Sequence, residues 1–298
     1  MQEKELELAG GSLYYSIREG KASVTGFHGQ APEVVIPETI EGCPVAEIGK
    51  KAFLSKKRLR RVTLPEGIEE VGDWAFAYCD NLAEVLVPGK AVRFGKAVFL
   101  DCGSLKRIAE RKPGRNRASQ PELLAAAVRA FDAYYLLDIP AAGSREWLGK
   151  WDARLAALLR APDREGYSRQ VLCGEEDYGS TDLAAYISRK RKNKVRLALL
   201  RLLFPEGLSD SLRQELEQYL LVHTKGGESP ETWQVILEEH GTEREYYRLF
   251  AELGCLTAGN LEGILADIGE EYPEMKAYFL RWQEDRLGER DFFAELEL

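Results

Sequence analysis

Histidine, methionine and cysteine are scarce in this chain, whose 298 residues contain three histidines, two methionines and five cysteines. None of the histidines (His28, His223 and His240) has a cysteine or histidine partner at metal-ligand spacing, and no two cysteines form a CxxC pair. The common zinc-site and thiol-redox patterns are therefore excluded, and we expect no metal site and no cofactor.

The sequence also lacks any run of about 18 apolar residues, and its first residues, MQEKELELAGG, are acidic where a signal peptide would be basic. We therefore expect no membrane span and a cytoplasmic location. A cell-surface or secreted location is the alternative if the chain is a trimmed form of a longer product. The odd, scattered cysteines favour reduced thiols over a disulfide framework.

The sequence also has no surplus of positive charge, because its formal net charge is -8 at pH 7. Proteins that bind nucleic acid usually carry clustered positive charge, so we expect no nucleic-acid partner. Hydrophobic residues make up 45% and charged residues 30%, as in an ordered soluble protein, and the length favours two domains.

No catalytic motif stands out: there is no nucleophile beside a base, no paired carboxylates and no phosphate-binding loop. The segments GSTD at Gly179 and HTKGG at His223 are typical of helix ends. The sequence therefore favours a protein that is not an enzyme. An uncharacterised enzyme in the helical half is the third hypothesis, after the two binding functions given below.

The clearest positive feature is an internal repeat with a period of 23 residues. The copies LRRVTLPEGIEEVGDWAFAYCDN and LAEVLVPGKAVRFGKAVFLDCGS begin at Leu59 and Leu82, and a truncated copy begins at Leu105. An earlier copy begins at Val34 and carries five extra residues around Gly42. Such self-similarity predicts stacked coils of one strand per turn, with strands over 34–36, 61–64, 84–87 and 106–108.

The pattern LxxVxIP followed by VxxIGxxAFxxC resembles the BspA-type leucine-rich repeat over residues 31–108. The resemblance implies a short β-solenoid and, because relatives are often exported, an adhesin that binds host or cell-surface proteins as the alternative function. In the pattern itself, the proline ends each strand and Phe53, Phe76 and Phe99 fill the core.

Both ends of a coil stack need caps, because exposed sheet edges invite aggregation. At the first end, residues 13–27 alternate around Glu19-Gly20 and predict a β-hairpin. At the other end, we expect a helix over 121–137 to cover the last coil. Cys79 and Cys102 should lie one above the other, close enough for a disulfide, although reduced thiols are favoured.

From residue 109 a polar segment with a Pro-Gly marks a boundary, and helix start and stop signals follow to the end of the chain. We expect an α+β protein of two domains, the repeat domain over 1–110 and an all-helical domain over 111–298. LFAELGCLT in the second is similar to part of an ankyrin unit, which implies stacked helical hairpins. The basic run Arg189–Lys192 with Lys194 is expected to be a solvated turn between two helices.

Repeat architectures present long ordered surfaces, so the sequence favours a monomeric protein-binding module or scaffold. We expect recognition on the outward strand face, in two columns of equivalent positions. The first column alternates in charge and should pair with itself, while the second is more apolar. The candidate residues are Glu33, Arg61, Glu84 and Arg107 in the first column, and Val35, Thr63 and Leu86 in the second.

Overall fold

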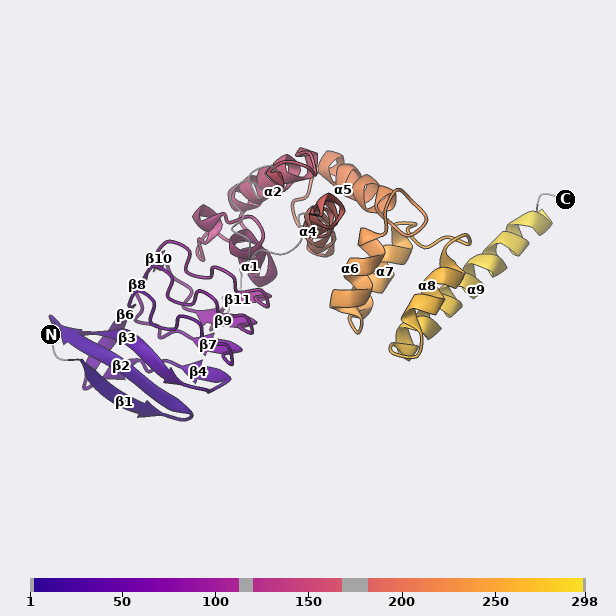
Figure 1. Cartoon of the computed structure of the whole chain (residues 1–298). Helices are drawn as coiled ribbons and strands as arrows, with labels where there is room; N and C mark the ends of the chain where they lie inside the picture. Colours follow the sequence, from indigo (N-terminus) through magenta and orange to yellow (C-terminus); the bar gives the residue numbers. More distant parts are fainter. Residues whose placement is uncertain (1–2, 113–119, 168–181, 297–298) are drawn as a thin grey trace. The chain divides into compact units, whose positions relative to one another are not determined.

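The computed structural model describes residues 3–112, 120–167 and 182–296 (Figure 1). It divides into two compact units, residues 1–154 and 155–298, and the division falls within α2 (Arg145–Arg160). The first is strand-rich and the second is helical, so the α+β fold class in two parts is confirmed. The domain boundary at 110/111 stays a prediction, although the last strand ends at Glu110 and the next described helix begins at Pro121.

The first unit begins with an antiparallel sheet formed by β1 (Lys4–Leu8), β2 (Gly11–Arg18) and β3 (Lys21–Gly29). The predicted hairpin over 13–27 is confirmed, and it turns at Glu19 and Gly20, both with positive φ. β3 then pairs in parallel with β6 (Cys43–Ile48), so the hairpin is continuous with the first coil.

The coil carries a β-sheet on each of two sides. One is the four-stranded sheet, in the order β11 (Arg107–Glu110), β9 (Glu84–Val87), β7 (Arg61–Thr63) and β4 (Glu33–Val35). The other continues from β6 to β8 (Glu70–Val71) and β10 (Arg93–Phe94). Every pairing between successive coils is parallel, and the register follows the 23-residue period except between β4 and β7, where the insertion makes Glu33 the partner of Arg61. The predicted strands are confirmed to within two residues.

The extra residues of the first copy form a small hairpin. β5 (Thr39–Ile40) pairs antiparallel with the start of β6, and Glu41 and Gly42 make the turn with positive φ. The insertion therefore projects as a local loop, and the coil keeps its register on either side.

A column of phenylalanine rings fills the coil. Phe53, Phe76 and Phe99 are buried, and consecutive rings lie 5.0 and 5.7 Å apart between centroids with nearly parallel planes. Stacked aromatic side chains each remove a large apolar area from water, so this column is the main hydrophobic element of the repeats. Their predicted burial is confirmed.

The last coil is covered by α1 (Pro121–Arg129), which packs against β11 and buries Leu123 and Leu124. The predicted cap is confirmed, but its predicted extent to residue 137 is wrong. The helix ends at Arg129, and Asp132, three residues later, takes a left-handed conformation with φ 51°. A short 3-10 helix, η1 (Tyr134–Leu136), follows.

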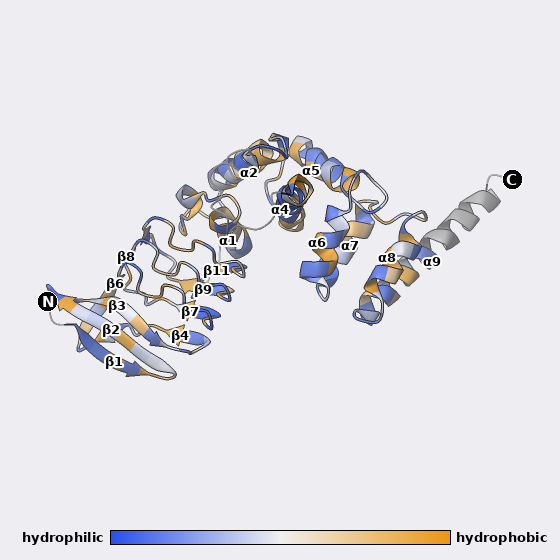
Figure 2. Ribbon diagram, viewed as in Figure 1, coloured by the Kyte–Doolittle hydropathy of each residue, from blue (hydrophilic) through white to orange (hydrophobic). Residues whose placement is uncertain are grey.

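The helical unit contains the rest of α2 and six further described helices, and Figure 2 shows hydrophobic and hydrophilic residues side by side along α2 and α4 to α8. Their bounds are α4 (Leu183–Leu203), α5 (Asp210–Val222), α6 (Glu231–His240), α7 (Arg244–Glu252), α8 (Leu261–Ile268) and α9 (Pro273–Leu296). Their core centres on Trp233, whose ring lies 5.4 Å from Phe250 and 6.2 Å from Phe279. The indole N–H donates to Asp267 over 2.8 Å, so its polar edge is also satisfied.

The basic run expected to be a turn lies in the middle of α4, so that prediction is wrong. Lys194 is buried and its ammonium group donates to Asp163 over 2.7 Å, while Arg191 donates to the same carboxylate over 2.8 Å. Lys192 pairs with Glu238 over 2.6 Å. Acidic side chains from neighbouring segments thus pair with Arg191, Lys192 and Lys194, while Arg189 and Lys190 lie over the Tyr186 ring. Among the described residues, no helix is both long and apolar enough to cross a membrane.

Candidate functional site

The outward face of the four-stranded sheet carries a continuous ladder of ion pairs. Arg61 lies between two acids, with its guanidinium 3.2 Å from Glu33 and 2.7 Å from Glu84. Glu84 also approaches Arg107 at 3.9 Å. The hydrogen bond that Arg61 donates to Glu84 and the charges of both acids raise the pKa of Arg61 above its ordinary value. The predicted self-pairing of this column is confirmed.

The ladder extends one step beyond the repeats, which the sequence did not predict. Arg107 contacts Glu122 in the first turn of α1 at 3.2 Å. The helical cap therefore closes the ladder with a fifth charged residue. The pairs are largely exposed, so each contributes little to stability, and their main effect is to leave the column without a strong net charge.

The second column is apolar but unevenly accessible. Val35 is 62% exposed, whereas Thr63 is 9% exposed and Leu86 is half-buried. The difference follows from position, because β4 is an edge strand with one neighbour while β7 and β9 each have two. The outward exposure expected of Thr63 is therefore wrong, and the accessible apolar surface of this column is concentrated at Val35.

Arg111 crosses the carboxyl ends of these strands. Its guanidinium donates to the Leu64 carbonyl over 3.0 Å and also binds the carboxylate of Glu38. Burial acts to raise the pKa of Glu38, but the hydrogen bonds from Arg111 and from the Glu66 N–H outweigh it and hold the pKa below its usual range. Arg111 thus links the last coil to the first across the end of the sheet.

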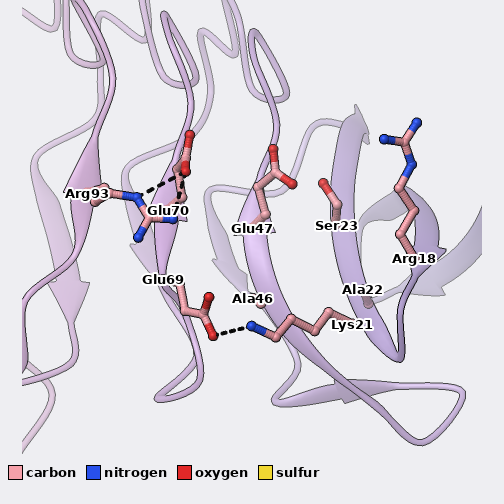
Figure 3. Close-up of a pocket in the computed structure, with 9 residues that line it drawn as sticks. All are labelled: Arg18, Lys21, Ala22, Ser23, Ala46, Glu47, Glu69, Glu70 and Arg93. Atoms are coloured by element: carbon pink, nitrogen blue, oxygen red, sulfur yellow. Dashed lines mark hydrogen bonds and ion pairs between the residues drawn. The ribbon is translucent and has the colours of Figure 1, made fainter.

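A pocket of about 200 Å³ lies on the opposite side of the coil, over β3, β6 and β8 (Figure 3). Its charged lining is balanced and largely paired within itself. Lys21 lies 2.6 Å from Glu69, and Arg93 lies 2.9 Å from Glu70. The hydrogen bond from Lys21 lowers the pKa of Glu69. Because these partners neutralise one another, the pocket offers no net charge to a ligand, and nothing in the sequence pattern pointed to it.

The residues flagged as helix ends behave as such where they are described. His223 is the carboxyl cap of α5, and the Asp182 carboxylate accepts a hydrogen bond from the Ala184 N–H at the start of α4. Gly179, Ser180 and Thr181 lie outside the described residues. Within the described ranges, no three histidine, cysteine, aspartate or glutamate side chains are placed to hold a metal ion.

Comparison with known families identifies residues 30–113 as a BspA type leucine-rich repeat region. The helical unit has no assignment among these matches, and no curated protein matches the chain. The region agrees with the one indicated by the 23-residue pattern.

Three solved structures are similar to this chain. They are a leucine-rich repeat protein of T. pallidum (31% identity, TM-score 0.32), a leucine-rich cell surface protein from Faecalibacterium prausnitzii A2-165 (22%, 0.31) and a leucine-rich repeat protein from Bacteroides capillosus ATCC 29799 (24%, 0.24). The matches cover 35%, 36% and 36% of this chain, and 49%, 31% and 71% of those proteins. The chain thus spans less than half the length of the first two.

Proposed function

We propose that the repeat region binds a partner protein through the outward face of the four-stranded sheet. Leucine-rich repeat regions are typically protein-binding and usually non-catalytic, and this one presents an ordered face closed at both ends. The observation that carries the choice of face is Val35, an apolar side chain 62% exposed at the edge of the sheet.

The surroundings of Val35 fit the anatomy of a protein interface. Apolar contacts at the centre of such interfaces are bordered by polar groups that stay hydrated. Here Val35 and the half-buried Leu86 form the apolar part, and the Glu33–Arg61–Glu84 ladder borders it. Because each arginine of the ladder is paired with acids, the ladder does not carry enough net charge to select a partner, and recognition depends on the apolar contact.

Two substitutions test this face directly. Val35→Asp and Leu86→Asp place a charge in the apolar column, and both should remove most of the binding of any protein that the intact chain retains from a lysate. Lys90→Asp is the matched control, because Lys90 is exposed in the turn after β9, away from the column. Thermal melting of each variant separates lost binding from lost folding.

The outcome also distinguishes the two units. A partner whose affinity is unchanged by both substitutions, in variants that still fold, would rule out this face as the recognition surface. If the helical unit expressed alone retained that partner, the binding function would belong to the helical unit.

A further inference from the structure

The hairpin at the start of the chain extends only one of the two sheets of the coil. Its last strand, β3, pairs with β6 in the seven-stranded sheet, whereas β4 in the four-stranded sheet has β7 as its neighbour. At the opposite end of the four-stranded sheet, β11 packs against α1. Within the part of the chain that the structure describes, no strand pairs with the other edge of β4 (Figure 1).

The later coils show which bond this edge lacks. The backbone N–H of Arg61 donates over 3.0 Å to the Pro32 carbonyl of the coil before, and the equivalent N–H groups of the next two coils make the corresponding bonds. Glu33 occupies the same position as Arg61 in the first coil, where no strand of this sheet precedes it. The repeat therefore defines a strand position that the chain itself leaves empty.

The unpaired backbone groups alternate along β4. The Pro32 carbonyl accepts from β7 and the Ile36 N–H donates to the Thr63 carbonyl over 3.0 Å, so residues 32, 34 and 36 face β7. The N–H and C=O groups of Glu33 and Val35 consequently point to the other side. None of these four groups has a hydrogen-bond partner among the described residues. Such a row of free donors and acceptors is a template for a strand from another chain.

The side chains at this edge indicate what an added strand would carry. Charge alternates along the first column from Glu122 to Glu33, so a cation is the next member of the series. The Glu33 side chain is 60% exposed, and Arg61 contacts one of its two carboxylate oxygens. Val35 is 62% exposed, so an apolar neighbour there would remove hydrophobic area from water.

We propose that the partner protein adds an extended segment to the free edge of β4 as a fifth strand, with a lysine or arginine beside Glu33 and an apolar side chain beside Val35. This inference rests on the function proposed above, because it concerns the same face, and it names the class of partner. A second copy of the chain is a poorer fit, since β4 carries no cation to place beside Glu33.

Two prolines limit the length of the contact. Pro32 and Pro37 flank β4 and have no N–H to donate, so the added strand can pair over about four residues. The short edge also protects the chain from unlimited sheet growth. With at most four backbone hydrogen bonds, we expect an isolated peptide to bind with a dissociation constant on the order of 1 mM.

A peptide that reads the same in both directions provides the direct test. In acetyl-Ser-Arg-Thr-Val-Thr-Arg-Ser-amide, an arginine lies beside Glu33 and the valine beside Val35 whether the strand runs parallel or antiparallel. Broadening of the peptide NMR signals by the full chain measures binding. A peptide that shows no broadening at concentrations above the expected dissociation constant overturns the proposal.

Methylation of alternate backbone nitrogens separates strand addition from any other contact. One peptide carries the methyl groups on both threonines, and the other carries them on the arginines and the valine, so the two have the same side chains and charge. Only one of these sets faces β4 in either direction of the strand. We expect one set to weaken binding at least tenfold and the other to leave it nearly unchanged. An equal effect of both sets overturns the proposal.

Substitutions in the chain locate the contact. Val35→Pro removes an outward N–H but no bond to β7, and it should weaken peptide binding at least tenfold, whereas Val35→Ile keeps the N–H and should bind as the original chain does. Glu33→Lys should weaken binding severalfold and should favour the peptide whose arginines are replaced by glutamates. Melting of each variant excludes unfolding, and peptide binding unchanged by Val35→Pro would place the contact elsewhere.

The same variants distinguish this inference from the function on which it rests. A lysate protein that is lost on Val35→Asp and on Val35→Pro supports both. If that protein is lost on Val35→Asp but retained by Val35→Pro, the face binds its partner without strand addition, and the inference alone fails. Sedimentation equilibrium of the full chain tests the remaining occupant, because self-association that Val35→Pro removes would show that a second copy fills the edge and would overturn the proposal.

Discussion

The ring of Phe27 lies 5.3 Å from the ring of Phe53 and within 19° of its plane, although Phe27 belongs to the hairpin and not to a repeat. The Phe27 N–H also donates to the Ala52 carbonyl over 2.9 Å. The hairpin therefore continues both the ring column and the backbone bonding of the coils, and it caps the stack by reproducing the contacts of one more coil.

Phe76 has a stacked ring on each side, so its removal should be costly. We expect Phe76→Ala to lower the free energy of unfolding by roughly 3 to 5 kcal/mol, because the surrounding coil cannot collapse to fill the cavity. Denaturant unfolding measures the loss. Val35→Ala serves as the control and should change stability by less than about 0.5 kcal/mol, since that side chain is exposed. An unchanged midpoint for Phe76→Ala would contradict the burial.

The contacts of α1 predict how a shortened chain behaves. Arg129 donates to the Gly103 carbonyl over 3.0 Å, and Trp151 donates to the Leu123 carbonyl over 3.1 Å, so the coil, α1 and α2 hold one another. Residues 1–110 alone should aggregate or remain partly unfolded. Residues 1–154 should be monodisperse in dilute solution and melt cooperatively, as light scattering and circular dichroism would show. Two equally well-behaved fragments would mean that α1 is dispensable as a cap.

The buried thiols should be chemically silent in the native state. Burial raises the pKa of Cys79 to about 11 and that of Cys102 to about 12, and their thiols donate to the Phe53 and Phe76 carbonyls over 3.1 Å. Little thiolate is present at pH 8, so alkylation should be slow until the coil unfolds. Cys43, only half-buried, should react first of these three. Mass spectrometry of peptides after timed alkylation measures each rate, and rapid labelling of Cys79 in folded protein would refute the prediction.

The helical unit should lose stability in mild acid through His223. Burial, followed by the positive charge of Arg191, lowers the pKa of this imidazole below its ordinary 6.5. The unfolded chain therefore binds a proton at a higher pH than the folded unit does. The stability that neutral His223 contributes is fully present above about pH 6.5 and declines as the pH falls below that value. Melting followed at 222 nm between pH 5 and 8 should show this slope, and His223→Gln should flatten it. If the variant showed the same pH dependence of melting as the original chain, other titrating groups would be responsible for it.

The repeat region could be predicted closely because each of its positions recurs. The same leucine position recurs at Leu59, Leu82 and Leu105, so three copies indicate the same buried environment. The strands, the ring column and the charge ladder follow from that register. The exposure of Thr63 was misjudged because the alternation along a strand shows only which side of the sheet a residue faces. It does not say how closely the neighbouring strands cover it.

The helical part was harder to predict because its decisive contacts join residues distant in sequence. The run at residues 189–192 resembles a solvated turn until Asp163 and Glu238 are brought against it.

The parallel stacking of coils between two caps has an evolutionary consequence. In its strand pairing each coil contacts only the coils before and after it, so a duplication of one 23-residue unit would leave the packing of the hairpin and of α1 as it is now and would separate only the side-chain link from Arg111 to Glu38. Such an event would lengthen the sheet by about 4.8 Å and shift the pattern of its exposed side chains. The length of the sheet can therefore change by whole repeats through recombination between the repeats of the gene, and no new fold has to arise.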